Sequence, residues 1–256
     1  MHRDPKISET TPFGAHSEMV AHPGGKSERE VELAIFKDHR YSFFYWLKWT
    51  RLLQESGQIS ESESPTLVTI DWHRDLAPPS DSDKEALNSL NQQDLEEVRD
   101  FTVYQLDPHN DGHVLSAAWL NVIGDIILLK NYGMEQKDHW TDRDGHNHQI
   151  MEFTSIDTFQ SEITARDGPM YLDIDLDYFI KNKVAPYQRT DVQIYKDEEI
   201  ESVIDPQNPL FQHILKYLEG ITLASEPRYC GGIRNSNHIL EVILNQLFTQ
   251  DMEWRQ

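Results

Sequence analysis

Two short acidic clusters contain the side chains best suited to chemistry: residues 71–75 (DWHRD) and residues 173–177 (DIDLD). Side chains alternate between the two faces of an extended strand, so the first, third and fifth residues of each cluster are expected to project together. Such crowding is unfavourable, because two unit charges about 4 Å apart repel by about 4 kcal/mol at an effective dielectric of about 20. Divalent cations would remove the conflict, and oxygen-rich sites with one or two imidazoles suit hard ions such as manganese.

The elements that must position these clusters alternate along the chain. Short runs of β-branched and aliphatic residues are separated by longer stretches of helical period, which predicts an α/β fold with a parallel sheet. Expected strands cover 31–36, 66–70, 125–129 and 221–224, and residues 171–172 lead into the second cluster. Expected helices cover 41–54, 81–101, 113–122, 211–219 and 237–248. Both clusters end or follow buried strands, which places them at the carboxyl edge of the sheet, where α/β folds bind ligands.

The remaining segments indicate one domain. Residues 1–29 are polar, so we expect a flexible or peripheral N-terminal arm followed by a single domain over 30–256. Residues 58–65 form a polar connector, and residues 138–149 a hydrophilic loop. This loop contains His139, His146 and His148, but so polar a segment is more often solvated than metal-binding.

The charge of the chain excludes several partners. Its 256 residues include 23 Lys and Arg against 44 Asp and Glu, a formal net charge of −21. Phosphate backbones and anionic lipid would repel such a protein, so neither nucleic acid nor a membrane is an expected partner. The lone Cys230 forms no intramolecular disulfide, and no signal-peptide pattern is found, so a cytoplasmic location is expected. A homo-oligomer is possible.

Several blocks of the sequence resemble known enzymes. IDWHRD (70–75) and LDIDLD (172–177) resemble the D-x-H-x-D and D-x-D motifs of the arginase and ureohydrolase superfamily. FKDH (36–39) with the aromatic stretch after it, residues 110–126 and residues 223–232 resemble a divergent arginase-fold group. That group includes peptide arginases, which convert arginine to ornithine within ribosomally made peptides. The resemblance implies a three-layer α/β/α fold, two Mn²⁺ ions, and attack of a metal-bridging hydroxide on the guanidinium carbon of arginine, with release of urea.

The resemblance also implies roles for individual residues. Asp71 would bridge the two ions, within a ligand set of His39, Asp71, His73, Asp75, Asp175 and Asp177. Asp173 would orient a ligand or a basic side chain, although which two aspartates of 173–177 bind metal stays open. Asp75 would relay a proton to the departing amine, with His113 as first and His109 as second candidate for the shuttle to solvent. Glu226 would bind the guanidinium, unless it pairs structurally with Arg228 or Arg234.

Three other functions remain alternatives. Free-arginine enzymes use polar loop residues after D-x-H-x-D to hold the substrate backbone, whereas this chain has Leu-Ala-Pro-Pro at 76–79, which favours a peptide substrate over free arginine or agmatine. A metal-dependent deacetylase of the same superfamily is disfavoured, because the chain has no His-His pair. A non-catalytic binder of cationic peptides is the third alternative.

Overall fold

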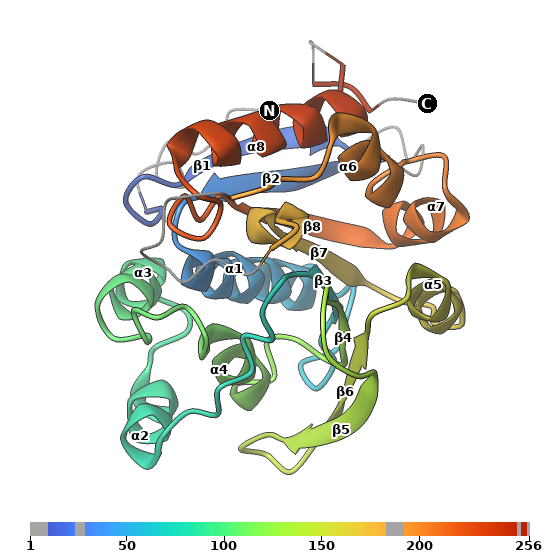
Figure 1. Cartoon of the computed structure of the whole chain (residues 1–256). Helices are drawn as coiled ribbons and strands as arrows, with labels where there is room; N and C mark the ends of the chain where they lie inside the picture. The colour runs from blue at the N-terminus through green and yellow to red at the C-terminus, as the bar shows by residue number, and fades with distance from the viewer. Residues whose placement is uncertain (1–9, 24–28, 183–191, 250–251, 255–256) are drawn as a thin grey trace.

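A computed structural model describes residues 10–23, 29–182, 192–249 and 252–254. It contains one eight-stranded mixed sheet with the order β1-β2-β8-β7-β3-β4-β6-β5 (Figure 1). The strands are β1 (His16–Ala21), β2 (Glu30–Phe36), β3 (Thr66–Ile70), β4 (Ile126–Leu129), β5 (Gln136–Thr141), β6 (Asn147–Phe153), β7 (Met170–Asp175) and β8 (Leu218–Ala224). The predicted α/β class with a mostly parallel sheet is therefore confirmed.

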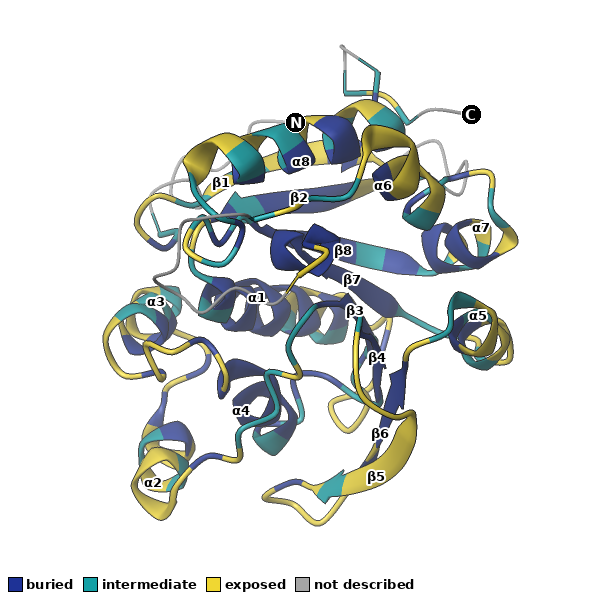
Figure 2. Ribbon diagram, viewed as in Figure 1, coloured by how far each residue is buried: buried dark blue, intermediate teal, exposed yellow. Residues whose placement is uncertain are grey.

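The six inner strands run parallel to one another, and only β1 and β5 at the two edges pair antiparallel. Strand β4 (IILL) is wholly apolar, and β3 (TLVTI) has only threonine besides apolar residues, as expected for strands that are covered on both faces. Figure 2 shows these central strands buried, while β5 is exposed. Parallel pairing brings the carboxyl ends of all six inner strands to one edge of the sheet.

Helices cover both faces of the sheet and complete the three layers that the resemblance implies (Figure 1). One core contains side chains of α5 (Ile156–Thr164), α6 (Asp197–Val203), α7 (Pro209–Lys216) and α8 (Ile233–Leu247). The other contains side chains of α1 (Ser42–Glu55), α2 (Asp81–Ser89), α3 (Leu95–Tyr104) and α4 (His113–Trp119). Each face of the sheet thus has its own apolar core.

Helix α1 positions the first candidate ligand. The 3₁₀ turn η2 (His39–Tyr41) follows β2 and leads directly into α1. Phe43, Phe44 and Trp46 of α1 are fully buried, and aromatic side chains bury the largest apolar areas in a core. Lys48 adds a buried ion pair with Glu32 of β2, at 2.7 Å between Nζ and Oε2. The start of α1, and with it His39, is therefore held firmly against the sheet.

The acidic segment 81–101 differs from its prediction, because it forms two helices instead of one. Leu90 ends α2 with an extended backbone (φ −63°, ψ 122°). Asp94 then caps α3 by accepting hydrogen bonds from the backbone N–H groups of Glu96 and Glu97. A side-chain cap satisfies N–H groups that a helix start otherwise leaves unpaired, so a second start within the segment is favourable.

Two segments expected to be irregular contain strands. Residues 16–21 lie within the predicted N-terminal arm but form β1, which pairs with β2, so the sheet begins before residue 30. The hydrophilic segment 138–149 forms most of the β5–β6 hairpin, with His148 buried. Sequence polarity suggested loops in both cases because edge strands carry many exposed side chains. In the described part of the chain, no helix has the length and apolar character needed to cross a bilayer.

The close approach of α1 to β8 provides a test of the packing. A Cβ at Gly220 would overlap the ring of Trp49. We expect Gly220→Ala to lower the free energy of unfolding by about 1–3 kcal/mol, because overpacking forces a shift of the helix or the strand. Denaturant unfolding measures the change. Gly112→Ala is the control: its Cβ would lie 3.8 Å from its nearest neighbours, the Ala77 carbonyl oxygen and the Asp107 Cβ, and we expect a loss below about 1 kcal/mol. Equal losses in the two variants would contradict this packing.

Candidate metal centre

Four neighbouring strands deliver the candidate residues to one edge of the sheet. His39 follows β2, Asp71 follows β3, and Asp175 is the last residue of β7. Glu226 lies two residues beyond β8. Because β2, β8, β7 and β3 are consecutive in the sheet, these four segments meet although they are far apart in the sequence. The site lies where open α/β sheets bind ligands.

The six predicted ligands converge. Their potential ligand atoms form two groups, within each of which the atoms lie within 4.8 Å of one another, and Asp71 belongs to both. One group is His39, Asp71, Asp75 and Asp175, and the other is Asp71, His73 and Asp177. Two ligands of one ion at about 2.1 Å each lie no more than about 4.2 Å apart, so small adjustments would close either group around an ion. The buried His and Asp clusters could therefore hold a metal ion.

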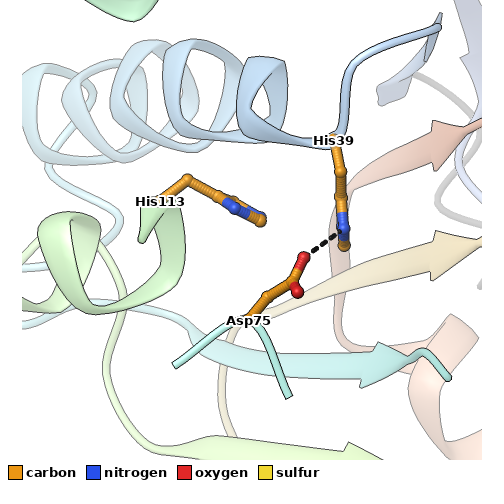
Figure 3. Close-up of side chains that lie close together, drawn as sticks. All are labelled: His39, Asp75 and His113. Carbon is orange, nitrogen blue, oxygen red and sulfur yellow. Dashed lines mark hydrogen bonds and ion pairs between the residues drawn. The ribbon is translucent and has the colours of Figure 1, made fainter. Parts of the chain in front are cut away.

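His39 is oriented by its two ring nitrogens. Nε2 donates a hydrogen bond to Asp173 Oδ2 at 2.8 Å. Nδ1 then faces the cluster, 2.9 Å from Asp75 Oδ2 and 3.2 Å from Asp175 Oδ2. Figure 3 shows His39, Asp75 and His113 close together, with a dashed line between His39 and Asp75. A carboxylate behind the distal nitrogen is the usual arrangement of a metal-binding histidine, because it fixes the tautomer and the ring.

Asp173 lies behind His39, as the resemblance implies, and belongs to neither ligand group. Its carboxylate accepts hydrogen bonds from the hydroxyls of Ser42, Thr69 and Thr222, in addition to His39. Burial opposes ionisation of Asp173, but His39 and these hydrogen bonds outweigh it and lower the pKa of Asp173. The carboxylate is thus committed to four donors, and Asp175 and Asp177 are the two aspartates of 173–177 that face the cluster.

Sequence reasoning missed the hydroxyls around Asp173. Thr69 and Thr222 are the residues in register with Asp173 on the neighbouring strands β3 and β8. Each is a buried polar residue between two buried apolar neighbours, and buried polar groups require partners. That contrast is the signal that could have identified them.

Negative charge dominates the centre. Burial, followed by repulsion from Asp75, Asp175 and Asp177, raises the pKa of Asp71 well above its ordinary range. Burial and Asp177 raise the pKa of Asp175 to about 7. Every ion pair described for Asp71, Asp75, Asp175 and Asp177 is with a histidine. These carboxylates therefore need protons or bound cations, and an oxygen-rich, buried donor set with two imidazoles suits a divalent ion.

The sequence predicted that strand alternation would bring the side chains of Asp71, His73 and Asp75 together. The structure brings them together in a different way. The strand ends at Ile70, and Asp75 has a left-handed backbone with φ 49°. Asp71 Oδ1 accepts a hydrogen bond from the backbone N–H of His73 at 2.7 Å. Asp177 Oδ1 accepts one from the N–H of Trp72 at 3.2 Å. A turn stabilised by the aspartates themselves, and not an extended chain, directs the three side chains inward.

Arg74 anchors this loop to the neighbouring strands. Its Nε and Nη2 both donate to Glu152 of β6, with Nη2 2.6 Å from Oε1. Lys130 and Gln136 also donate to the fully buried Glu152 carboxylate. Burial opposes ionisation of Glu152, but these hydrogen bonds outweigh it and lower its pKa. No sequence pattern indicates Glu152, because its partners lie on three separate segments.

The centre opens into a cavity of about 540 Å³. Its lining includes His73, Asp75, His109, Glu226 and Tyr229. Glu226 is 5% exposed, with a left-handed backbone (φ 29°), and its Oε1 accepts hydrogen bonds from the His39 N–H at 3.2 Å and from Asn110 Nδ2. Burial, followed by Asp175, raises the pKa of Glu226 well above its ordinary range.

Glu226 also approaches the second aspartate cluster, since its ligand atom lies within 4.8 Å of those of Asp175 and Asp177. Among the described residues, no ion pair joins it to Arg228 or Arg234, so the structural alternative has no support in these contacts.

The two shuttle candidates have different access to solvent. His113 is 1% exposed; its Nδ1 donates to the Asn110 carbonyl at 3.0 Å, and its ring stacks on Trp46. Burial and the neighbouring His39 lower the pKa of His113 well below its ordinary value. His109 is exposed and lines the cavity. Of the two predicted shuttle candidates, His109 is therefore the one that reaches solvent.

The three histidines of 138–149 are not part of a metal group among the described residues. His146 Nδ1 lies 2.8 Å from Asp142 Oδ2, and His148 Nε2 lies 3.4 Å from the same oxygen. These contacts stabilise the turn of the β5–β6 hairpin.

No protein-family model matches the chain, and no significant match was found among curated proteins.

Metal binding at this centre should release protons. Burial lowers the pKa of His73, but the contact with Asp177 outweighs it and raises this pKa to about 9. The pKa of Asp175 is raised to about 7 by burial and by Asp177. Both must lose their protons to bind an ion, so we expect Mn²⁺ affinity to fall as the pH is lowered from about 9 to below 7. Calorimetry in two buffers of different ionisation enthalpy measures the released protons. His146→Gln is the control and should behave as the parent. Affinity independent of pH would contradict the prediction.

The Glu152 network should stabilise the ligand loop. Glu152→Gln keeps the shape of the side chain but leaves the buried Lys130 without its counter-charge. We expect a loss of about 3 kcal/mol in the free energy of unfolding, together with weaker Mn²⁺ binding. Glu162→Gln removes a carboxylate that pairs with Lys137 and Arg166 near the surface, and should cost less than about 1 kcal/mol. Unfolding curves that show equal losses would argue against an anchoring role.

Proposed function

We propose that the protein is a manganese-dependent hydrolase that converts arginine side chains in a peptide to ornithine, with release of urea. One observation carries the proposal: two potential ligand groups share Asp71, and Glu226 lies beside Asp175 and Asp177 at the opening of a cavity. The centre thus combines an anionic donor set for two cations with a further carboxylate for a cationic substrate. A cytoplasmic location is part of the same proposal.

The donor set fits two divalent ions. His39, Asp75 and Asp175 would complete the site of one ion, His73 and Asp177 that of the other, and Asp71 would serve both. Two dications would balance the four aspartates in formal charge. Bound there, they would supply a Lewis acid that generates a nucleophile from water near neutral pH. The proposal of Mn²⁺ rests on ligand hardness, because carboxylates and imidazoles suit it.

Glu226 is suited to bind the guanidinium group. A guanidinium is a planar cation that carboxylates hold through charge-assisted hydrogen bonds. The backbone N–H of His39 and the side chain of Asn110 both donate to Oε1 of Glu226, which fixes the carboxylate at the cavity. Burial makes ionised Glu226 costly, so a cationic substrate would stabilise its charged form.

Two residues are placed to move protons. Asp75 lines the cavity and contacts His39, so it can deliver a proton to the departing amine of the substrate. Exposed His109 lines the same cavity and can carry protons between the cavity and solvent. Buried His113 packs against His39, where it is suited to hold the imidazole in place.

The cavity favours a peptide over free arginine. Leu76 and Ala77, which follow Asp75, line it and offer no polar side-chain atoms. The backbone N–H of Ala77 is already bonded to the carbonyl of Asp111 at 2.7 Å. A free amino acid carries a charged α-amino and α-carboxylate group that must be paired, whereas a peptide does not.

Turnover of a defined substrate tests the function. We expect the Mn²⁺-loaded protein to convert an arginine-containing peptide to a product lighter by about 42 Da with equimolar urea, because hydrolysis removes the amidine carbon with its two nitrogens. Mass spectrometry and a urea assay measure both products. Free arginine, agmatine and an acetyl-lysine peptide, tested in parallel, represent the competing enzyme classes. Urea from free arginine with an unchanged peptide would contradict the peptide assignment.

Variants separate metal binding from substrate binding. Asp175→Ala should lose bound Mn²⁺ and activity, each by at least about tenfold. Glu226→Gln should keep the metal content but lower kcat/KM by about 10- to 100-fold, since a charge-assisted contact is lost. His146→Ala, outside the centre, is the matched control. Peptide binding without turnover in every preparation would favour the non-catalytic alternative.

A further inference from the structure

A second cavity of about 360 Å³ adjoins the first. The two cavities share His109, Asn110, Glu226 and Tyr229 in their linings. The residues that only the second cavity has are Lys37, Asp38, Pro108, Pro227 and Arg228. The candidate metal centre therefore opens into a longer cleft, in which Glu226 lies at the junction.

The second cavity differs from the first in charge. Among the residues that only this cavity has, two are cationic, Lys37 and Arg228, and one is anionic, Asp38. Neither cation forms an ion pair with a described residue. Cations in this chain are outnumbered 44 to 23 by carboxylates, so two unpaired cations in one cavity beside the reaction centre favour an anionic partner.

The backbone around Lys37 and Arg228 is held by hydrogen bonds. Lys37 directly follows β2, and its carbonyl accepts a hydrogen bond from the Glu226 N–H at 3.2 Å. Arg228 lies in the turn after β8, where the N–H of Tyr229 donates to the Glu226 carbonyl at 2.9 Å and that of Gly232 to the Pro227 carbonyl at 2.8 Å. The backbone that carries these two exposed cations is thus held beside Glu226.

We propose that this second cavity is a subsite for a substrate carboxylate, bound by Lys37 and Arg228 while Glu226 holds the neighbouring guanidinium. The inference rests on the proposed function for the identity of the substrate. An acidic side chain next to the target arginine and the terminal carboxylate of a peptide that ends in arginine share this chemistry. The side chains of adjacent residues start from Cα atoms about 3.8 Å apart, so the two charged groups of such a substrate can lie in adjoining cavities.

Three short peptides test the subsite on the Mn²⁺-loaded protein. Two are blocked at both ends and differ only in Asp or Asn beside the arginine, and the third ends in arginine with a free carboxylate. We expect Kd and KM to favour the Asp peptide or the free carboxylate over the Asn peptide by about three- to tenfold, as for a charge-assisted contact at a partly exposed site. Whichever anionic peptide binds better identifies the source of the carboxylate.

The double variant Lys37→Gln/Arg228→Gln should abolish this preference and leave binding of the Asn peptide unchanged. Lys137→Gln, which removes an exposed cation on β5, is the control and should retain it. Equal affinity for all three peptides in the parent, or a preference that survives the double variant, would overturn the subsite. Ornithine formation without any preference would leave the proposed function intact, whereas a preference in Kd without ornithine would retain the subsite and reject the reaction.

Discussion

The structure depends on the burial of several carboxylates at one edge of a parallel sheet. Parallel pairing brings the ends of β3 and β7 side by side, so Asp71, Asp175 and Asp177 lie within ligand distance of one another. Their mutual repulsion is costly in a buried site, and histidines are the only ion-pair partners described for them. Bound cations would relieve this repulsion, which ties the stability of the centre to the chemistry proposed for it.

The surroundings of the cluster are built to keep its geometry. A row of three polar residues, Thr69, Asp173 and Thr222, crosses three adjacent strands and holds the back of His39. On the opposite side, Glu152 holds Arg74 and so restrains the loop that carries the D-x-H-x-D residues. Metal ligands need such support, because an imidazole or carboxylate that can rotate binds its ion weakly.

The cleft in front of the cluster changes in charge along its length. Near the centre it is lined by Asp75 and Glu226, which suits a guanidinium. Beyond Glu226 its charged lining residues are Lys37, Asp38 and Arg228, and the two cations suit the carboxylate proposed above. The substrate proposed above, with both charges on adjacent residues, would match this pattern.

The sequence by itself determined the α/β class, most strands, and the two clusters that converge, because local periodicity and residue type are properties of neighbouring positions. It failed where polarity concealed an edge strand, as in 16–21, and where a cap split one helix into two. Only the tertiary structure decided that Asp173 supports His39 while Asp175 and Asp177 face the cluster, and that His109, not His113, reaches solvent. These distinctions depend on which lone pairs are already bonded and which side chains are covered, and both are set by strands and helices distant in sequence.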